Sequence, residues 1–369
     1  MKKNNINKGP WYKRYNEYKT LAEKYISSYN NLEKSQSVQY EIDNFYYNSI
    51  YSLIFESNQM EDAGTKTLGE TKRIFLDENI DLSFTEINYK PIISLDKIPI
   101  YNFLNLLHKF DNLTEYKHIL LSFKGKSKTS KEVLQHYNAK VFASNIARIT
   151  AILFNIMKLI KNERTLGISD EEIKNKYLES FRKNDCLDDF INTTLFSVNL
   201  IKNLHSIIAE DLLPNDAEVT AGEFRNYDDI TIGNTGLIFP AAKNIDNAMK
   251  NFCKQSNEII NNILSGEEND IFYAAAKISY NFVRIHPFPD FNGRISRIIL
   301  NMVLWSLWFP FCVSLRGNKK EKHKYLVSLK RADNGDLIPY SALIAKRIVE
   351  IFQEFDKNLV ISGLPSILN

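Results

Sequence analysis

The chain has 369 residues, 44% of them hydrophobic and 25% charged, which is the composition of a soluble protein able to bury a sizeable core. Its formal net charge of +3 is too small to indicate nucleic acid or a membrane surface as a partner. No apolar stretch follows the basic N-terminus and no run approaches the roughly 18–20 apolar residues of a membrane helix, so we expect a cytoplasmic protein without a signal peptide.

Most of the chain is predicted to be helical, because apolar residues recur at spacings of three and four. The helical candidates, in chain order, are residues 21–47, 101–110, 141–160 and 199–212. The third is mostly apolar and is expected to be central. Strand signals are confined to residues 88–95, 119–123 and 230–239, the last with Gly233, Asn234 and Gly236 in its turn. The pattern therefore predicts a mainly α fold.

The densest group of chemical functions lies between His286 and Arg297. This stretch reads His-Pro-Phe-Pro-Asp-Phe-Asn-Gly-Arg-Ile-Ser-Arg, and apolar residues follow it at helical spacing. It predicts a loop that runs into a buried helix, with the functional residues at the helix N-terminus. Unpaired N–H groups and the helix macrodipole make such a terminus an anion site.

The residue types of this loop suggest a magnesium–nucleotide site. Arg294 and Arg297 carry guanidinium groups that suit phosphate oxygens. Asp290 is a hard oxygen ligand of the kind that Mg²⁺ uses beside substrate phosphates. His286 can accept a proton near neutral pH, which makes it a candidate general base.

The same stretch resembles the signature of the Fic (Fido) family, H-P-F-x-D/E-G-N-G-R-x-x-R, with Phe291 standing where the family usually has glycine. Residues 273–309, 324–339 and 221–240 are similar to the family's core helices and to the segment that carries its flap. The resemblance implies a Fic-type helical core with a short β-hairpin flap.

With this resemblance the chain divides into three parts. Residues 1–198 would form an N-terminal helical region, residues 199–350 the Fic core, and residues 351–369 a C-terminal tail. The N-terminal region would hold an inhibitory helix at about 45–64 and an insertion at about 64–128, made of short strands and loops. The sequence does not reveal the purpose of that insertion.

The resemblance implies a role for each residue of the signature. His286 would be the general base, and Asp290 would hold Mg²⁺ on the α- and β-phosphates. Asn292 and Gly293 would line the anion hole through side chain and backbone N–H. Arg294 would neutralise the leaving group, and Arg297 would reach the γ-phosphate. Phe291 could still present its N–H if its ring turned outward, but a requirement for positive φ would distort the anion hole.

Two further groups of residues follow from the resemblance. The flap residues Ile230, Thr231, Ile232 and Gly233 would contact the nucleotide and present an edge strand to an extended target segment. On one helix face, Tyr325, Leu329 and Asp333 match positions that contact adenosine in relatives, although ordinary core and surface roles would suit them equally well.

An inhibitory motif is indicated near the N-terminus. Ser57-Asn-Gln-Met-Glu61-Asp62 resembles the family pattern S/T-x-x-x-E-G/N, with Asp62 departing from it. Ser57 and Glu61 share a helix face at this spacing. By resemblance, Glu61 would pair with Arg297 and keep that arginine from the γ-phosphate. A competing register, from Ser52 to Glu56, fits the first part of the pattern.

The resemblance implies a protein adenylyltransferase that moves AMP from Mg-ATP to a Ser, Thr or Tyr hydroxyl of a protein target. It would be autoinhibited by its own N-terminal helix. The alternatives are a catalytically silent nucleotide-binding or interaction module, and a Fic enzyme that removes AMP or transfers another phosphate-containing group. The sequence leaves the target and the oligomeric state open, a dimer included.

Overall fold

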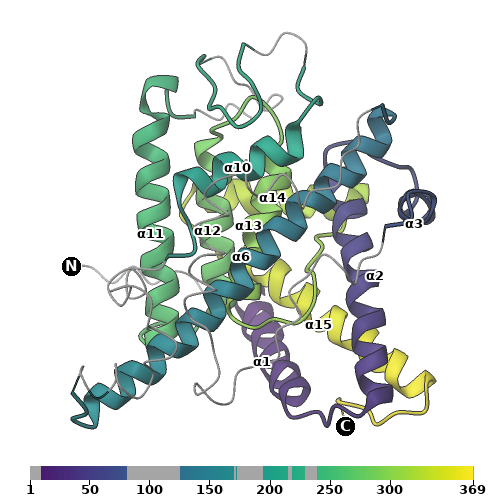
Figure 1. Ribbon diagram of the computed structural model, residues 1–369, viewed down its shortest axis with the longest axis vertical. Coiled ribbons are helices and arrows are strands. Elements are labelled where there is room, and N and C mark those ends of the chain that lie inside the picture. The colour runs from purple at the N-terminus through teal and green to yellow at the C-terminus, as the bar shows by residue number, and fades with distance from the viewer. Residues whose placement is uncertain are drawn as a thin grey trace.

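The computed structural model describes residues 10–80, 125–169, 172, 194–214, 218–228 and 239–368. Regular structure in these ranges is helical (Figure 1). The helices are α1 (Pro10–Asn30), α2 (Gln36–Met60), α3 (Leu68–Asp77), α6 (Lys128–Thr165), α10 (Val198–Ala209), α11 (Ile245–Ser265), α12 (Ile271–Ile285), α13 (Asn292–Ser306), α14 (Lys319–Asp333) and α15 (Ile338–Ile361), with a short 3-10 turn η2 (Ala242–Asn244) before α11.

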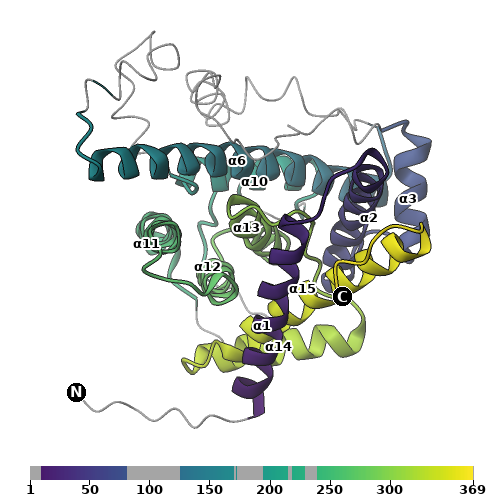
Figure 2. The same ribbon diagram turned by 90° about the horizontal axis from the view of Figure 1, so that it is seen from below.

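The helices lie in layers around α13 (Figure 2). Long helix α6 lies across one side of α13, with α10 packed against it, and α12 packs on another side of α13. Beyond α12, α15 is crossed by α1 and flanked by α14. Helix α2 stands at one end of this assembly and contacts α6, α13 and α15. The mainly helical fold predicted from the sequence is confirmed.

Helix α13 is the centre of the core. Its apolar side chains Ile295, Ile298, Ile299, Met302 and Val303 are all fully buried, as their spacing predicts. Helix α6 is long and apolar enough to cross a membrane by length and composition alone. In this fold, however, 83% of its most apolar window is buried against other parts of the protein. It contains the helix expected over residues 141–160, which is buried but lies on one side of α13 and not at the centre of the fold.

Two predicted elements differ from the structure. The helix expected over 21–47 is two helices, because α1 ends at Asn30 and Ser35 caps a new helix by accepting a hydrogen bond from the amide of Val38 at 3.4 Å. Residues 68–77, expected among strands and loops, form α3. Thr67 and Glu70 build a reciprocal capping box there, which stabilises its first turn.

Some predictions fall outside the described residues. These are the helix at 101–110, the strands at 88–95 and 119–123, and the hairpin flap at 230–238. The division into three parts remains a prediction, although α15 continues through the expected boundary at residue 350 without a break. Helix α6 packs directly on α10 and α13, so the N-terminal region shares its core with residues 199–350.

Candidate active site

The signature residues form the tight loop between α12 and α13. His286 ends α12 with φ 51° and Phe291 precedes α13 with φ 63°, so a left-handed residue stands at each end of the loop. Asn292 folds back across it: Oδ1 accepts a hydrogen bond from the amide of Phe288 at 3.1 Å, and Nδ2 donates to the Phe288 carbonyl at 2.7 Å. The Asn292 amide is thus engaged with the loop itself. This differs from the expected place of that side chain in an anion hole and leaves the backbone N–H for that purpose.

The N-terminus of α13 is open to an anion because no side chain of its own caps it. The carboxylate of Glu61, which follows the last residue of α2, lies over this terminus. A Cβ placed on Gly293 would be 2.2 Å from Glu61 Oε1, far too close for any side chain. Glycine at position 293 therefore permits a carboxylate to approach the first turn of the helix, where an anion is favoured.

Arg297 joins α13 to the end of helix α2. Its side chain is 2% exposed, its Nη2 lies 2.6 Å from Glu61 Oε1, and its Nε donates to Ser57 Oγ at 2.8 Å. Nη2 also donates to the Ser57 carbonyl at 2.8 Å. Burial would raise the pKa of Glu61, but Arg297, with further help from Arg294 and Lys322, outweighs it and holds that pKa below its usual value. The pair is therefore ionised at neutral pH.

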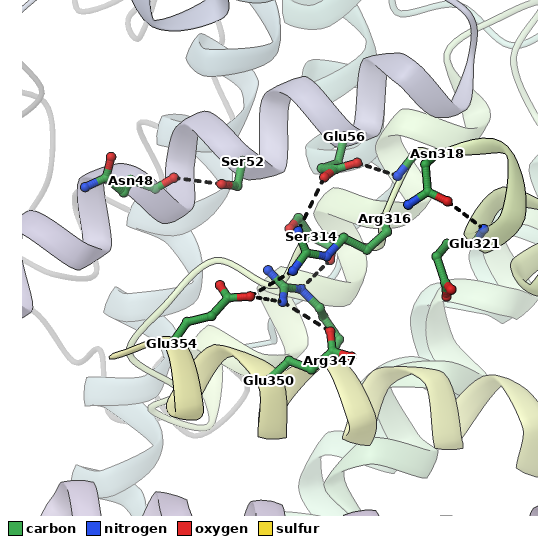
Figure 3. Close-up of polar contacts among 11 residues, drawn as sticks. Asn48, Ser52, Glu56, Ser314, Arg316, Asn318, Glu321, Arg347, Glu350 and Glu354 are labelled. Atoms are coloured by element: carbon green, nitrogen blue, oxygen red, sulfur yellow. Dashed lines mark hydrogen bonds and ion pairs between the residues drawn. The ribbon is translucent and has the colours of Figure 1, made fainter. Parts of the chain in front are cut away.

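The competing glutamate faces a different part of the protein (Figure 3). Glu56 Oε2 accepts a hydrogen bond from the amide of Gly317 at 2.5 Å, and Glu56 Oε1 lies 3.9 Å from Arg316. Arg316 in turn pairs with Glu354 of α15 at 2.8 Å. Glu56 thus fastens α2 to the segment that precedes α14, and Glu61 is the acidic residue of the motif that meets Arg297.

Phe291 packs its ring into the core, contrary to the outward ring considered from the sequence. The side chain is 3% exposed, and the guanidinium carbon of Arg294 lies 3.6 Å from the ring centroid. A cation over an aromatic face at this distance is attracted by the ring. The ring also meets His205 edge-on at 6.2 Å. Phe291 has a positive φ, a conformation that phenylalanine disfavours, and the packing of its ring compensates for this cost.

We expect Phe291→Gly to lower the free energy of unfolding by roughly 1–4 kcal/mol. Emptying a buried phenylalanine site costs about 3–5 kcal/mol, and release of a left-handed residue returns about 1–2 kcal/mol. Urea unfolding monitored by circular dichroism measures the difference. A variant more stable than the parent would mean that backbone strain outweighs the ring packing.

Arg294 has unused hydrogen-bonding capacity beside this ring. It is 4% exposed, and its Nε and Nη1 have no hydrogen-bond partner among the described residues. Its Nη2 lies 3.8 Å from Asp290 Oδ2, a long ion pair. Burial lowers the pKa of Arg294, although the guanidinium stays charged at neutral pH. A buried cation with unpaired donors fits an anionic ligand such as a phosphate.

Asp290 is the one carboxylate of the signature loop, and its side chain is half-exposed beside Arg294. Oδ1 accepts a hydrogen bond from the amide of Phe291 at 2.5 Å. The described residues hold no cluster of three or more His, Cys, Asp or Glu that could form an all-protein metal site. A single accessible carboxylate next to an anion site nevertheless fits Mg²⁺, which keeps several waters and binds substrate phosphates.

His286 lies at the opposite end of the signature loop from the N-terminus of α13. Burial lowers its pKa to about 4, and the nearby Arg225 guanidinium acts in the same direction. The ring lies 4.7 Å from that of Phe239, measured between centroids. The imidazole is therefore neutral at physiological pH, which is the form that can accept a proton.

The face of α14 expected to meet adenosine is already in contact with α12 and α13. Tyr325 is buried with its hydroxyl beside the Arg297 guanidinium, and burial raises its pKa. Asp333 accepts a hydrogen bond from Tyr280 at 2.8 Å and pairs with Arg284 at 2.9 Å. Leu329 is half-buried. The flap residues 230–233 lie outside the described residues, so their place at the site stays a prediction.

Three buried polar residues near the site, Asn58, His136 and Arg225, are not among the candidates that the sequence offers. Asn58 of α2 contacts His136 of α6 through Oδ1 and Nδ1 at 3.3 Å, next to Ser57. Arg225 hydrogen-bonds to the backbone on either side of the loop start, at His286 and Pro287. No motif spacing marks these residues, and nothing in the polar stretch around Asn58 distinguishes it from its neighbours.

Comparison with known proteins agrees with this geometry. Residues 195–304 match the Fic/DOC family. The chain is 30% identical over 166 residues to protein adenylyltransferase Fic of Aedes aegypti, which covers 44% of this chain and 30% of that protein. It is 45% identical over 62 residues to a Fido domain-containing protein of Dictyostelium discoideum, covering 17% of this chain and 41% of the relative. The matches thus span well under two thirds of these relatives.

Solved structures show the same fold at low sequence identity. Fic-1 from C. elegans matches with a TM-score of 0.56 and 18% identity, covering 95% of this chain and 73% of that one. A Fic domain-containing signalling protein from Bacteroides thetaiotaomicron matches with a TM-score of 0.57 and 16% identity, covering 94% of this chain and 97% of that one. The family match, the signature loop and the fold agree, and the chain contains a Fic/DOC domain at residues 195–304.

Proposed function

We propose that this protein transfers AMP from ATP to a hydroxyl group of a protein and that its own helix α2 restrains it. The observation that carries the proposal is the N-terminus of α13, which no side chain of its own caps, with two buried arginines beside it and a neutral histidine at the other end of the same loop. Two relatives that are 30% identical to this chain over 166 residues carry the name protein adenylyltransferase Fic.

In the proposed reaction His286 takes the proton of a Ser, Thr or Tyr hydroxyl as its oxygen attacks the α-phosphorus of ATP. A new P–O bond joins AMP to the target, the bond to the β-phosphate oxygen breaks, and pyrophosphate leaves. The lowered pKa of His286 keeps the imidazole neutral and ready to accept this proton. A weak base suffices because it acts while the hydroxyl oxygen is forming its bond to phosphorus.

The remaining residues stabilise charge. The unpaired donors of Arg294 would bind phosphate oxygens of the leaving pyrophosphate, and the first N–H groups of α13 would bind the neighbouring phosphate. Mg²⁺, held by Asp290 and the nucleotide, would neutralise the α- and β-phosphates. Positioning and charge stabilisation supply most of the rate in such displacements.

Autoinhibition follows from competition for one guanidinium. Arg297 donates hydrogen bonds through Nε and Nη2 to Ser57 and Glu61. The Glu61 carboxylate lies over the first turn of α13, which a γ-phosphate would approach. A triphosphate and this carboxylate repel each other at the same terminus. While α2 stays in place, we expect ATP to bind without its γ-phosphate on Arg297, in a pose that does not support transfer.

The proposal is tested by intact-mass spectrometry of purified protein incubated with ATP and Mg²⁺, wild type beside Glu61→Gly. Addition of one AMP mass to the variant supports transfer. Binding of ATP without any mass change on the protein itself or on added protein acceptors would contradict it.

A silent nucleotide-binding module is the second candidate, and one observation favours it. Phe291 occupies the signature's glycine position with its ring buried under Arg294. If this ring holds Arg294 too far from the leaving group, ATP would bind and stay intact. Phe291→Gly in the Glu61→Gly background separates the two, because transfer that appears only in the double variant identifies the natural chain as silent.

We expect Asp290→Ala to weaken ATP binding in the presence of Mg²⁺ by about tenfold, because no other carboxylate of the loop can hold the ion on the phosphates. Isothermal titration with ATP, in Mg²⁺ and in chelator, gives both affinities. The variant should bind equally in the two buffers. Equal binding by the natural protein in both buffers would remove Asp290 from metal binding.

We expect Gly317→Ala to raise auto-modification in part, although residue 317 itself lies outside the nucleotide site. A Cβ at Gly317 would lie 2.6 Å from Gln59 Cβ and 2.6 Å from the Glu56 carbonyl, so the last turns of α2 must shift. Gly69→Ala is the matched control, since its φ is not left-handed and a Cβ there would meet only Thr67 Oγ1, at 3.8 Å. Phosphor imaging with labelled ATP measures both, and equal rates in the two variants would contradict restraint by the seating of α2.

A further inference from the structure

Arg225 is a buried arginine whose hydrogen bonds all go to backbone carbonyls around the start of the signature loop. Its side chain is 2% exposed. Nε donates to the His286 carbonyl at 2.9 Å, Nη1 to the Tyr227 carbonyl at 2.7 Å, and Nη2 to the Pro240 carbonyl at 2.6 Å. Its own amide donates to the Pro287 carbonyl at 2.9 Å. One residue thus fastens three separate backbone segments.

These segments converge on the imidazole of His286. The segment ending at Pro240 carries Phe239, whose ring lies 4.7 Å from the His286 ring. The exposed carboxylate of Asp228 also links the 225–228 and 239–242 segments, because its Oδ1 accepts a hydrogen bond from the amide of Ala242 at 2.5 Å. The backbone on one side of His286 and the aromatic ring against it are therefore both held through Arg225.

We propose that Arg225 is the positioning residue that fixes His286 for proton transfer by locking the 225–228, 239–242 and 286–287 segments together. This inference rests on the proposed function. The guanidinium suits the task because its planar fork directs donors in several fixed directions at once, which a lysine ammonium on a flexible stem cannot reproduce. Burying a cation against neutral carbonyls costs free energy, so the benefit of this arrangement is a fixed position for the three segments.

The same contacts separate Arg225 from nucleotide binding. Its partners flank His286, whereas the anion site is built by Gly293, Arg294 and Arg297 at the other end of the loop. Loss of the fork should misplace the base and leave the phosphate contacts in position. A misplacement of about 1 Å can cost on the order of a hundredfold in rate.

The test compares Arg225→Lys with its parent, Glu61→Gly, using ATP and Mg²⁺. We expect the rate of auto-modification at saturating ATP to fall roughly 10–100-fold, while the ATP affinity changes by less than about twofold. Arg73→Lys is the matched control, an exchange on the exposed face of α3, and it should leave both quantities unchanged. An unchanged rate in Arg225→Lys, or an equal loss of affinity and rate, overturns the positioning role.

Two further measurements keep the result decisive. If Arg225→Lys does not fold, Asp228→Ala is measured instead, because it removes the hydrogen bond to the Ala242 amide at an exposed site. A lower rate at unchanged ATP affinity supports the proposal, and an unchanged rate overturns it.

If the parent itself transfers no AMP, the proposed function fails, and NMR of ¹³C-labelled histidine tests the role of Arg225. A shift of the His286 ring signal in Arg225→Lys, with His136 unmoved, supports positioning, and an unmoved His286 signal overturns it.

Discussion

Glu61→Gly is expected to raise auto-modification with AMP by roughly 5–150-fold, the range of a coupling of about 1–3 kcal/mol. The variant removes the carboxylate that lies 2.6 Å from Arg297 and over the first turn of α13. Arg297 then exchanges a carboxylate for a γ-phosphate, and the anion site loses its competitor. Initial rates of AMP incorporation, measured by mass spectrometry over time, give the ratio to the natural protein.

The control for this prediction is Glu56→Gln. It keeps an oxygen that can accept the hydrogen bond of the Gly317 amide, and it should leave the rate unchanged because Glu56 does not reach Arg297. Arg297→Ala should lower the rate in the Glu61→Gly background, since the arginine is then missing from the ATP site as well. Activation by Glu56→Gln without activation by Glu61→Gly would show that the inhibitory residue has been misassigned.

His286→Ala is expected to abolish AMP transfer in the Glu61→Gly background, a loss of about 10²–10⁴-fold if the imidazole acts as general base. ATP affinity should stay close to that of the parent, because the base meets the incoming hydroxyl and not the phosphates. Single-turnover rates and ATP titration on the same preparation separate the two effects. Undiminished transfer by the variant would exclude His286 from the reaction.

The pH dependence checks the same assignment. Burial lowers the pKa of His286 to about 4, so the base stays neutral and the rate should be level between about pH 5.5 and 8. The sign for stability is opposite to that of a salt-bridged histidine. Because the unfolded chain binds a proton that the buried ring does not, stability is full above pH 6.5 and falls as the pH drops towards 4. A rate that halves near pH 6.5 would mean an ordinary, solvated imidazole.

The mainly helical class and the buried position of α13 follow from the sequence alone. Apolar spacing of three and four specifies a helix wherever one face must be buried, and it needs no knowledge of the partner surface. The same periodicity could not show that residues 21–47 hold two helices, because the decisive signal is one cap at Ser35 within a continuing amphipathic pattern. The helix at 68–77 had a readable signal in its Thr67–Glu70 box.

The local chemistry of the signature was also determined by the sequence, since the residues from His286 to Arg297 share one loop and one helix turn. Only the tertiary structure decided what they meet. It placed Glu61 rather than Glu56 on Arg297, because the two carboxylates point from α2 towards different neighbours. It buried the ring of Phe291 under Arg294. Spacing along a helix gives the face of a side chain, but its partner depends on how whole helices pack.

Arg225 marks the limit of the sequence most clearly. Its partners are backbone carbonyls at Tyr227, Pro240, His286 and Pro287, and a carbonyl is present at every position of every chain. No residue type or spacing in the sequence can predict such a contact. The sequence determined which groups could do chemistry, because that depends on side-chain identity. The tertiary structure decided how His286, the N-terminus of α13 and helix α2 are placed relative to one another, because that depends on packing between segments far apart in the chain.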